Sequence, residues 1–442
     1  AVLKLSCSRD VDRLEVVGCH LILSSDGAVA IGRQQTKWRI MLSATSDTAV
    51  RLIHPHDGLS ISPDHPSQQP EPIAQANAQT SRKGAARPMT TADVPAVAGL
   101  FLKVFRGTDK PASTDLKGYL HALTLGSPSY SEAAGTQIYQ QQDGLISSAL
   151  LSVPMRFMAC GNVIPGRLLG VFMTNRDSAG AAQLNLGLRP KKASLSFCDS
   201  ASPTSARSLM AIGGKTIPMQ NLEWVRTFRP LGALLGRLSP RLLRRIDPGL
   251  ATLARPVDAF LGRLRGGDLE SPAGLKVQEM SIPDFLAHAP RLIAHYAVRP
   301  LWSEDELGWL VGLAAQNTRL GAFTIRAIVD HTSATIGCFV YYASPGRTAH
   351  VLNILSLPGR EVGVLGAMFR HLEDTGHLEA RGRAQPALMA GLGLQRWLVF
   401  RHRAFAMALT RVPEVNDAIV RGDIYVGGLA GEDWSRLMCD FG

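Results

Sequence analysis

Small residues follow an apolar run in the stretch LLGVFMTNRDSAGAAQLNLGL, at 168–188. The apolar run is typical of a strand, and a helical pattern begins after the small residues. A helix N-terminus attracts anions through its free N–H groups and its dipole, and small side chains let a phosphate approach the backbone. An arginine at such a turn adds charge-assisted hydrogen bonds. The stretch therefore predicts either an ordinary strand-to-helix turn or a phosphate cradle.

A carboxylate follows this turn in the sequence. Asp199 lies at the end of the stretch ASLSFCDS, which predicts a buried strand. Acyl transfer to an amine needs a base that takes a proton from the ammonium group. Asp199 is our candidate for this base, and its alternative role is to cap the helix predicted at 202–214. The neighbouring Cys198 is less suited to chemistry, because an apolar strand generally holds an unreactive thiol.

The elements that must position these residues are predicted by periodicity and by turn signals. We expect two helices, a three-strand meander, the turn and its helix, a strand, a short helix and a final strand pair. The corresponding ranges are 90–105, 113–126, 136–142, 145–158, 167–174, 178–189, 193–200, 202–214 and 215–230. Asp143 and Gly144 are typical of the hairpin turn inside the meander.

This element order resembles that of the GCN5-related N-acetyltransferase superfamily over about residues 88–230. In that family the fourth strand leads into an Arg/Gln-x-x-Gly-x-Gly/Ala turn whose amides hold the pyrophosphate of coenzyme A. Arg176 and Ala181 match this turn, whereas Ala179 stands at the first glycine position. The resemblance implies that the cofactor is held by the turn and the strand edge before it, which comprise Val171, Phe172, Met173, Arg176, Asp177, Ser178, Ala179, Gly180, Ala181 and Ala182.

The second half of the chain resembles the same family more faintly, over 276–430. Ser303 and Glu306 form a capping-box pattern before a helix, and strands, a helix and further strands follow up to residue 410. Arg360 and Gly363 match the coenzyme A turn, so they are a second set of candidate cofactor-binding residues. The sequence leaves open which half binds the cofactor.

We therefore predict an α+β fold with two acetyltransferase-like domains, each a mixed, mostly antiparallel sheet flanked by helices. The predicted boundaries are a weakly ordered N-terminal extension at 1–88, domains at 89–230 and 276–442, and an arginine-rich helical linker at 231–275. Residues 231–268 can pack their leucines on the flanking domains or contact an anionic membrane surface.

Composition narrows the class of protein. The chain has 442 residues and a net charge of +11, but we find no helix-turn-helix, RNP motif or Cys/His finger, so we predict no nucleic-acid partner. The six cysteines are scattered, which argues against a metal site or a disulfide framework and suits a reducing cytoplasm. We find no signal-peptide pattern and no apolar run long enough to span a membrane.

The resemblance implies an N-acyltransferase that moves an acetyl or other acyl group from acyl-coenzyme A to an amine by direct attack. The acceptor is expected to be a small molecule or a peptide. The tyrosine acid that the family often places in the helix at 202–214 is absent here, so an acetyltransferase-like binding module without catalysis is an alternative. Another is an acyl- or aminoacyltransferase that acts on cell-envelope precursors at a membrane surface.

Overall fold

The structure is a computed structural model that describes residues 84–175, 180–230 and 274–441, and the backbone of six short strands between residues 3 and 53. The chain divides into two compact units, Ala1–Ser81 and Arg82–Gly442. Three expectations fall on residues outside this part: the linker at 231–275 for the most part, its proposed membrane contact, and the turn residues 176–179.

The first unit contains one antiparallel sheet whose strands pair in chain order. Its strands are β1 (Leu3–Lys4), β2 (Arg13–Val16), β3 (Cys19–Leu23), β4 (Ala28–Ile31), β5 (Arg39–Met41) and β6 (Arg51–Ile53).

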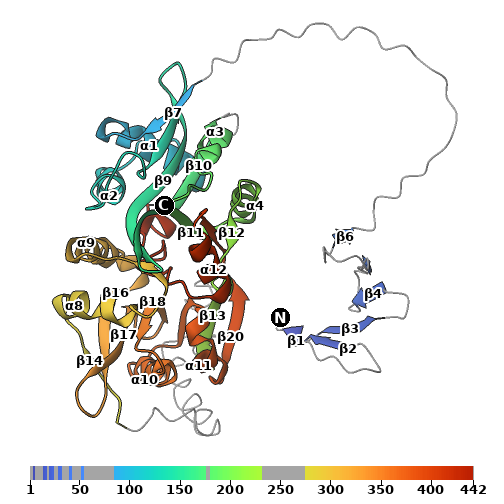
Figure 1. The fold of residues 1–442 in the computed structure, drawn as a ribbon, viewed down its shortest axis with the longest axis vertical. Coiled ribbons are helices and arrows are strands. Elements are labelled where there is room, and N and C mark those ends of the chain that lie inside the picture. The colour runs from blue at the N-terminus through green and yellow to red at the C-terminus, as the bar shows by residue number, and fades with distance from the viewer. Residues whose placement is uncertain are drawn as a thin grey trace, which may run out of the picture. The chain divides into compact units, whose positions relative to one another are not determined.

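The first sheet of the second unit has eight strands in the order β12-β21-β11-β10-β9-β8-β7, with β15 pairing against β9 (Figure 1). Its pairs are antiparallel except for β10 and β11, which are parallel. The strands are β7 (Ala85–Pro88), β8 (Gln137–Gln140), β9 (Ile146–Ala159), β10 (Asn162–Thr174), β11 (Leu195–Ala201), β12 (Lys215–Thr216), β15 (Val298–Pro300) and β21 (Phe405–Leu409).

The helices of the first half begin close to where the sequence predicts them. They are α1 (Val94–Phe101), continued by a π-helical turn at Leu102–Arg106, then α2 (Thr114–Thr124), α3 (Gly180–Leu186) and α4 (Pro203–Ala211). The side chain of Ser202 accepts the capping hydrogen bond of α4 from the Ser205 amide. The alternative role of Asp199 as the cap of this helix is therefore wrong.

The second sheet has seven strands in the order β14-β16-β17-β18-β19-β13-β20, and only β18 and β19 pair in parallel among its described strands. The strands are β13 (Leu222–Thr227), β14 (Lys276–Glu279), β16 (Ala322–Val329), β17 (Thr335–Ala343), β18 (Thr348–Ser356), β19 (Glu379–Arg383) and β20 (Leu398–His402). Two mixed, mostly antiparallel sheets flanked by helices confirm the predicted fold class.

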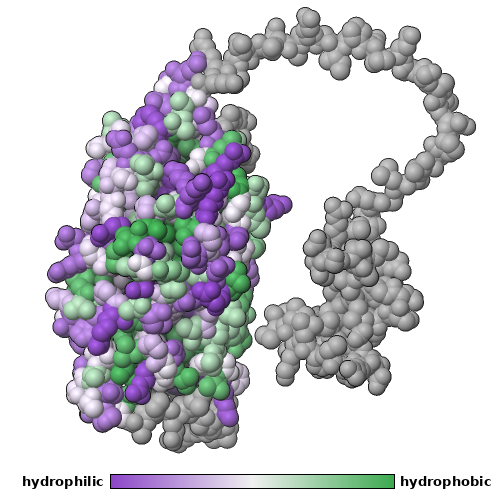
Figure 2. Space-filling model, viewed as in Figure 1, coloured by the Kyte–Doolittle hydropathy of each residue, from purple (hydrophilic) through white to green (hydrophobic). Residues whose placement is uncertain are grey.

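The helices of the second half are α8 (Ile282–Leu292), α9 (Glu304–Ala315), α10 (Glu361–Asp374), α11 (Met389–Gly393) and α12 (Pro413–Arg421). The capping box of Ser303 and Glu306 at the start of α9 is confirmed. Among the residues that the structure describes, no helix combines the length and apolar character needed to cross a membrane. Polar side chains cover much of the face shown in Figure 2, with apolar clusters among them.

The two halves exchange strands. β13 lies in the second sheet between β19 and β20, whereas β15 and β21 join the first sheet. The expectation that 215–230 forms one final strand pair of the first half is therefore wrong, because only β12 stays in the first sheet. Trp224 on β13 is fully buried and meets the ring of Phe369 edge-on at 5.3 Å, so packing ties this strand to the second half.

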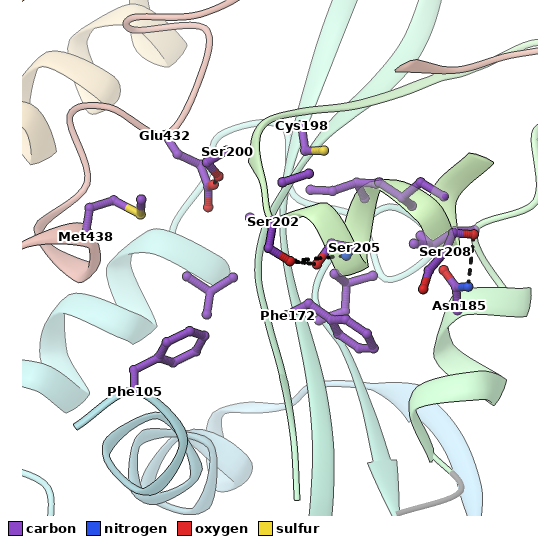
Figure 3. Close-up of a pocket in the computed structure, with 17 residues that line it drawn as sticks. Phe105, Phe172, Asn185, Cys198, Ser200, Ser202, Ser205, Ser208, Glu432 and Met438 are labelled. Carbon is purple, nitrogen blue, oxygen red and sulfur yellow. Dashed lines mark hydrogen bonds between the residues drawn. The ribbon is translucent and has the colours of Figure 1, made fainter. Parts of the chain in front are cut away.

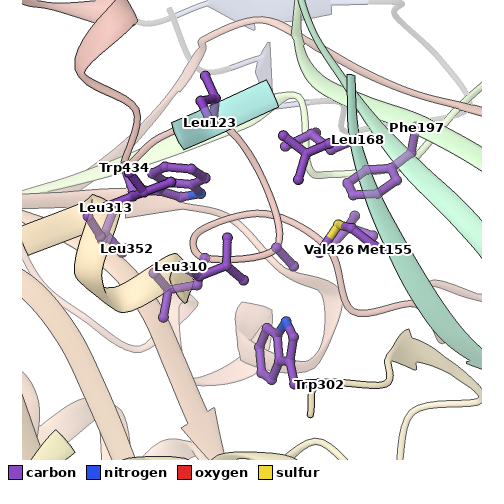
Figure 4. Close-up of a cluster of buried hydrophobic side chains, with 14 of the residues drawn as sticks. Leu123, Met155, Leu168, Phe197, Trp302, Leu310, Leu313, Leu352, Val426 and Trp434 are labelled. Atoms are coloured by element: carbon purple, nitrogen blue, oxygen red, sulfur yellow. The ribbon is translucent and has the colours of Figure 1, made fainter. Parts of the chain in front are cut away.

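One apolar core also spans both halves (Figure 4). The first half contributes side chains from α2, β9, β10 and β11, and the second half contributes side chains from α9, β18 and the C-terminal segment. Those labelled in the figure are Leu123, Met155, Leu168, Phe197, Trp302, Leu310, Leu313, Leu352, Val426 and Trp434. The sheets therefore depend on each other for burial of their apolar faces.

We expect the two halves to stay associated when the chain is cut. A protease site inserted between residues 231 and 273 should give a nicked protein that elutes as one species in size-exclusion chromatography, because each sheet retains a strand from the other half. The fragments should separate only in denaturant. Two fragments that elute separately without denaturant would contradict the exchange.

A substitution at the exchanged strand should weaken this association. Trp224→Ala removes a buried side chain and should cost about 3–5 kcal/mol, so the nicked variant should dissociate at a lower urea concentration. Val399→Ala on the neighbouring β20 is the control, because Val399 is exposed. Equal urea midpoints for the two variants would count against the packing role of Trp224.

Candidate functional site

The parallel strands β10 and β11 pair over only three positions. The last pair joins Leu168 and Phe197, and beyond it a cavity of about 220 Å³ opens between the strands. A bulge in β10 falls at the same level, between Leu169 and Phe172, which pair with Ser152 and Leu150 of β9. Bulges bend a strand and disrupt its ladder locally, so this one helps to separate β10 from β11.

The cavity lies between two different parts of the molecule (Figure 3). On one side α3 and α4 contribute Asn185, Ser205 and Ser208, and on the other side Phe105 and Met438 face the same space. The other residues that line it are Leu150, Leu169, Gly170, Val171, Phe172, Leu188, Cys198, Ser200, Ala201, Ser202, Leu209 and Glu432.

Glu432 brings a carboxyl group from the C-terminal segment into this cavity. It is 6% exposed, and the hydroxyl group of Ser200 donates a hydrogen bond to its Oε2. A Cβ atom at Gly170 would lie 2.6 Å from its Oε1, so the glycine makes room for the carboxyl group. Burial raises the pKa of Glu432 well above its ordinary value of 4.5, and the nearby carboxylates of Asp199 and Asp433 add to the shift.

Asp199, the base predicted from the sequence, does not line the cavity. Its side chain is 0% exposed, and its Oδ2 lies 3.4 Å from Nη2 of Arg383 on β19. Its Oδ1 accepts a hydrogen bond of 3.1 Å from the backbone N–H of Glu432. The structure thus places Asp199 in a buried ion pair, directly behind the residue that does reach the cavity.

Arg383 is shared between two carboxylates. Its Nη2 donates to both oxygens of Asp433 at 3.2 and 3.3 Å. Burial opposes the charge of Asp433, but Arg383 and Arg403 lower its pKa below the usual range. Burial raises the pKa of Asp199, which has the weaker contact with Arg383. Arg383 is therefore a buried part of this network, and Asp433 has the closer, hydrogen-bonded contact with it.

The predicted cofactor-binding residues of the first half lie in different environments. Val171 and Phe172 line the cavity, whereas Met173 is fully buried in the core. Arg176, Asp177, Ser178 and Ala179 lie outside the described residues, so the phosphate cradle stays a prediction. Gly180, Ala181 and Ala182 form the first turn of α3, a helix of seven residues.

Gly180 has a packing role that the sequence does not reveal. A Cβ atom there would lie 2.5 Å from Cγ of Tyr139. A larger residue at this position would therefore displace α3 or the tyrosine ring, and would not simply fill a phosphate site.

The counterpart gap in the second sheet is filled by the chain itself. β18 and β19 pair in parallel up to Val351 and Gly382, and beyond this pair Gly427 packs against Arg383 and Gly428 against Leu352. The side-chain amide of Asn353 donates to the hydroxyl oxygen of Tyr425 at 2.6 Å, and its Oδ1 accepts from the Leu429 amide at 2.7 Å.

The predicted cofactor residues of the second half follow β18, one of the two strands that border this filled gap. Arg360 and Gly363 lie at the start of α10, on the loop and helix that follow β18. Gly428 packs so closely on β18 that a Cβ atom there would lie 2.3 Å from the carbonyl oxygen of Leu352. A strand edge that contacts the protein's own chain is not free to contact a cofactor.

Cys198 is the remaining reactive group in the cavity wall. Burial raises the pKa of its thiol far above the ordinary value, so the thiolate nucleophile is not available at neutral pH. Glu432, in contrast, was not singled out by the sequence. The signal available was the Gly-rich run at 427–431 directly before two acidic residues, which indicates tight turns but not their location.

We expect the two buried aspartates to differ in their contribution to stability. Asp433→Asn leaves Arg383 without its hydrogen-bonded carboxylate and should cost about 3–5 kcal/mol, seen as a lower urea midpoint. Asp199→Asn keeps an oxygen for the Glu432 amide and should cost clearly less. Because the pKa of Asp433 is lowered on folding, its contribution is present at neutral pH and is lost as the pH falls below its ordinary value of 3.8. A larger loss for Asp199→Asn would contradict the closer pairing of Arg383 with Asp433.

Comparison with known proteins gives structural matches only. No protein-family model matches the chain, and no curated protein matches its sequence. A probable N-acyltransferase from Enterococcus faecalis is 10% identical, with 74% of this chain and 72% of that chain covered and a TM-score of 0.48. A GCN5-related N-acetyltransferase from Anabaena variabilis is 11% identical, with 74% and 72% covered and a TM-score of 0.49.

A third match is the N-myristoyltransferase of Saccharomyces cerevisiae, solved with bound myristoyl-CoA. It is 8% identical, with 78% of this chain and 81% of that chain covered and a TM-score of 0.39. The chain is similar over most of its length to structures of acetyl- and acyltransferases, and at these identities the likeness concerns the fold.

Proposed function

We propose that the chain is an acyl-coenzyme-A-dependent N-acyltransferase whose reaction takes place in the cavity between β10 and β11. The observation that carries this proposal is an open gap between two parallel strands with a buried carboxyl group inside it. Acyl transfer to an amine needs a base beside the reacting atoms and a space that excludes bulk water.

The two sides of the cavity suit two different substrates. On the side of α3 and α4, the strand edge at Val171 and Phe172 and the small side chains of Ser205 and Ser208 leave room for the pantetheine arm of acyl-coenzyme A. The helix α3, which follows the predicted pyrophosphate turn in the sequence, lies on this same side. The amine acceptor then enters on the side of Phe105 and Met438.

In this reaction the Glu432 carboxylate takes one proton from the ammonium group of the acceptor and passes it to solvent. The nitrogen lone pair attacks the carbonyl carbon of the thioester, a C–N bond forms and the C–S bond breaks. A second proton passes from the nitrogen to the departing sulfur, which leaves as the thiol. Ser200 orients the carboxyl group of Glu432, and Asp199 positions its backbone.

The second half has a supporting role in this proposal. Its own strand gap is filled by residues 424–430, and the same segment continues into the first half to deliver Glu432. We therefore assign acyl-coenzyme A to the first half alone. This division of roles favours an enzyme with one reaction site over two equivalent acetyltransferase domains.

Cofactor binding can be tested by filling the cavity from α4. Ser208→Trp places a large ring in the cavity and should weaken acetyl-coenzyme A binding by more than about tenfold in calorimetric titration. Met210→Trp is the matched control on the same helix, because Met210 is exposed and does not line the cavity. No binding by the unaltered protein, or equal binding by both variants, would defeat the proposed site.

The base can be tested by its pH dependence. Because burial raises the pKa of Glu432 above 4.5, we expect kcat/KM to rise with pH through that raised pKa as the carboxylate forms. Glu432→Gln should lower kcat by about 100-fold or more and abolish this rise, while acetyl-coenzyme A still binds. Glu304→Gln on the exposed start of α9 is the control.

The pH dependence of the free energy of unfolding gives a second test of the Glu432→Gln variant. A raised pKa means that the folded protein binds the proton more tightly than the unfolded chain. The contribution of Glu432 to the free energy of unfolding is thus present below pH 4.5 and is lost as the pH rises through the raised pKa. Glu432→Gln should remove this loss. An unchanged pH profile of both rate and stability would show that Glu432 is not the titrating group.

A further inference from the structure

A second cavity lies on the other side of α3 from the one proposed for acyl transfer. It has a volume of about 430 Å³, which is within the range of small-molecule sites. Gln183, Leu184 and Gly187 of the α3 region line it, whereas Asn185 lines the first cavity. Leu150 and Leu188 belong to the walls of both, so the two spaces are neighbours but are not the same site.

The base of this second cavity contains a buried arginine. Arg167 on β10 is 8% exposed, and its Nε donates a hydrogen bond of 3.0 Å to the hydroxyl oxygen of Ser196 on β11. Within the part of the chain that the structure describes, its two Nη atoms have no hydrogen-bond partner and no carboxylate pairs with it. Burial lowers the pKa of Arg167, but a guanidinium group keeps its charge at neutral pH.

Among the described residues, no carboxylate balances the charge of Arg167, although the residue is buried. Buried charges in proteins are paired or bind an ion of opposite charge, because an isolated buried charge is costly. The buried Arg383 shows the usual arrangement, with two carboxylates beside it. Arg167 instead lines the cavity of about 430 Å³ and a smaller adjoining one of about 190 Å³.

Two more cationic side chains surround the same space. Lys191 lines both cavities, and Arg189 lines the smaller one. Glu132 is the one acidic residue among the described residues that line them, and it forms no ion pair with Arg167. The local charge therefore favours an anion, with hydroxyl groups of Ser131 and Ser194 as further hydrogen-bond donors in the wall.

We propose that the cavity beneath α3 is a binding site for a small phosphate-bearing anion, with Arg167 at its base and Lys191 at its opening. A guanidinium group matches the oxygens of a phosphate with two parallel hydrogen bonds, and its free Nη atoms are the ones that can donate them. The volume admits a small organic phosphate as well as inorganic phosphate, so both are included in the test. Because the site shares no charged residue with the acyl-transfer cavity, the proposal does not rest on the proposed function.

The test measures phosphate binding to the full chain by calorimetric titration and by thermal unfolding. Inorganic phosphate and glycerol 3-phosphate are added separately, each against sodium chloride of equal ionic strength. We expect saturable binding and a rise in Tm with at least one of them, and the tighter ligand identifies the form of phosphate. No binding and no rise in Tm with either would overturn the proposal.

Two variants distinguish phosphate binding at this cavity from non-specific attraction of phosphate to a basic protein. Lys191→Ala should weaken phosphate binding by about tenfold, the usual effect of losing one charge-assisted hydrogen bond. Lys192→Ala is the matched control, because the neighbouring lysine carries the same charge but lines neither cavity. Equal weakening by both substitutions would show non-specific attraction and overturn the proposal.

Arg167→Met tests the base of the site and controls for folding. It should abolish phosphate binding while the Tm without phosphate stays unchanged or rises, because an unpaired buried charge has been removed. A Tm that falls in the absence of phosphate would show that Arg167 is structural, and retained phosphate binding would show that it is not a ligand. Acetyl-coenzyme A titration of the same variants should be unaffected, so the outcome is distinguishable from failure of the proposed acyltransferase.

Discussion

The buried guanidinium group of Arg383 is the charge around which the two halves meet. It pairs with Asp199 of the first sheet and Asp433 of the C-terminal segment, and it donates to the carbonyl oxygen of Gln220 just before β13. Satisfying this one group therefore fixes three separate parts of the chain. The backbone N–H of Glu432 is bonded to Asp199, and the next residue, Asp433, is paired with Arg383. These two contacts hold the carboxyl group of Glu432 in the cavity of the first sheet.

The same segment makes the two similar halves unequal. After the last parallel pair, β10 has Gly170 and β18 has Asn353 two residues on. Gly170 leaves space that the Glu432 carboxyl group enters, whereas the side chain of Asn353 binds Tyr425 and Leu429. One gap is therefore open with an acid inside it, and the other is closed by polar contacts. Strand exchange keeps this arrangement in place, because neither sheet is complete without the other half.

Local patterns predicted most elements of the first half. The meander, the helix after the turn and the strand at 193–200 follow from periodicity and from turn residues, which act over short distances. Sheet membership did not follow, because the local sequence of β13 predicts a strand but does not specify its partner strands. Only the part of the site that local sequence encodes was predicted. Val171 and Phe172 come from a local strand, but Glu432 reaches them from far along the chain.

The sequence by itself determined the order of the elements, the α+β class and the places where β10 ends and α3 begins. It also pointed to an acidic residue at the end of β11. Only the tertiary structure decided that Asp199 would be buried against Arg383, that Glu432 would face the cavity and that one of the two strand gaps would be filled. These outcomes depend on contacts between residues more than two hundred positions apart, such as Asp199 with Glu432, and no local pattern encodes such a contact.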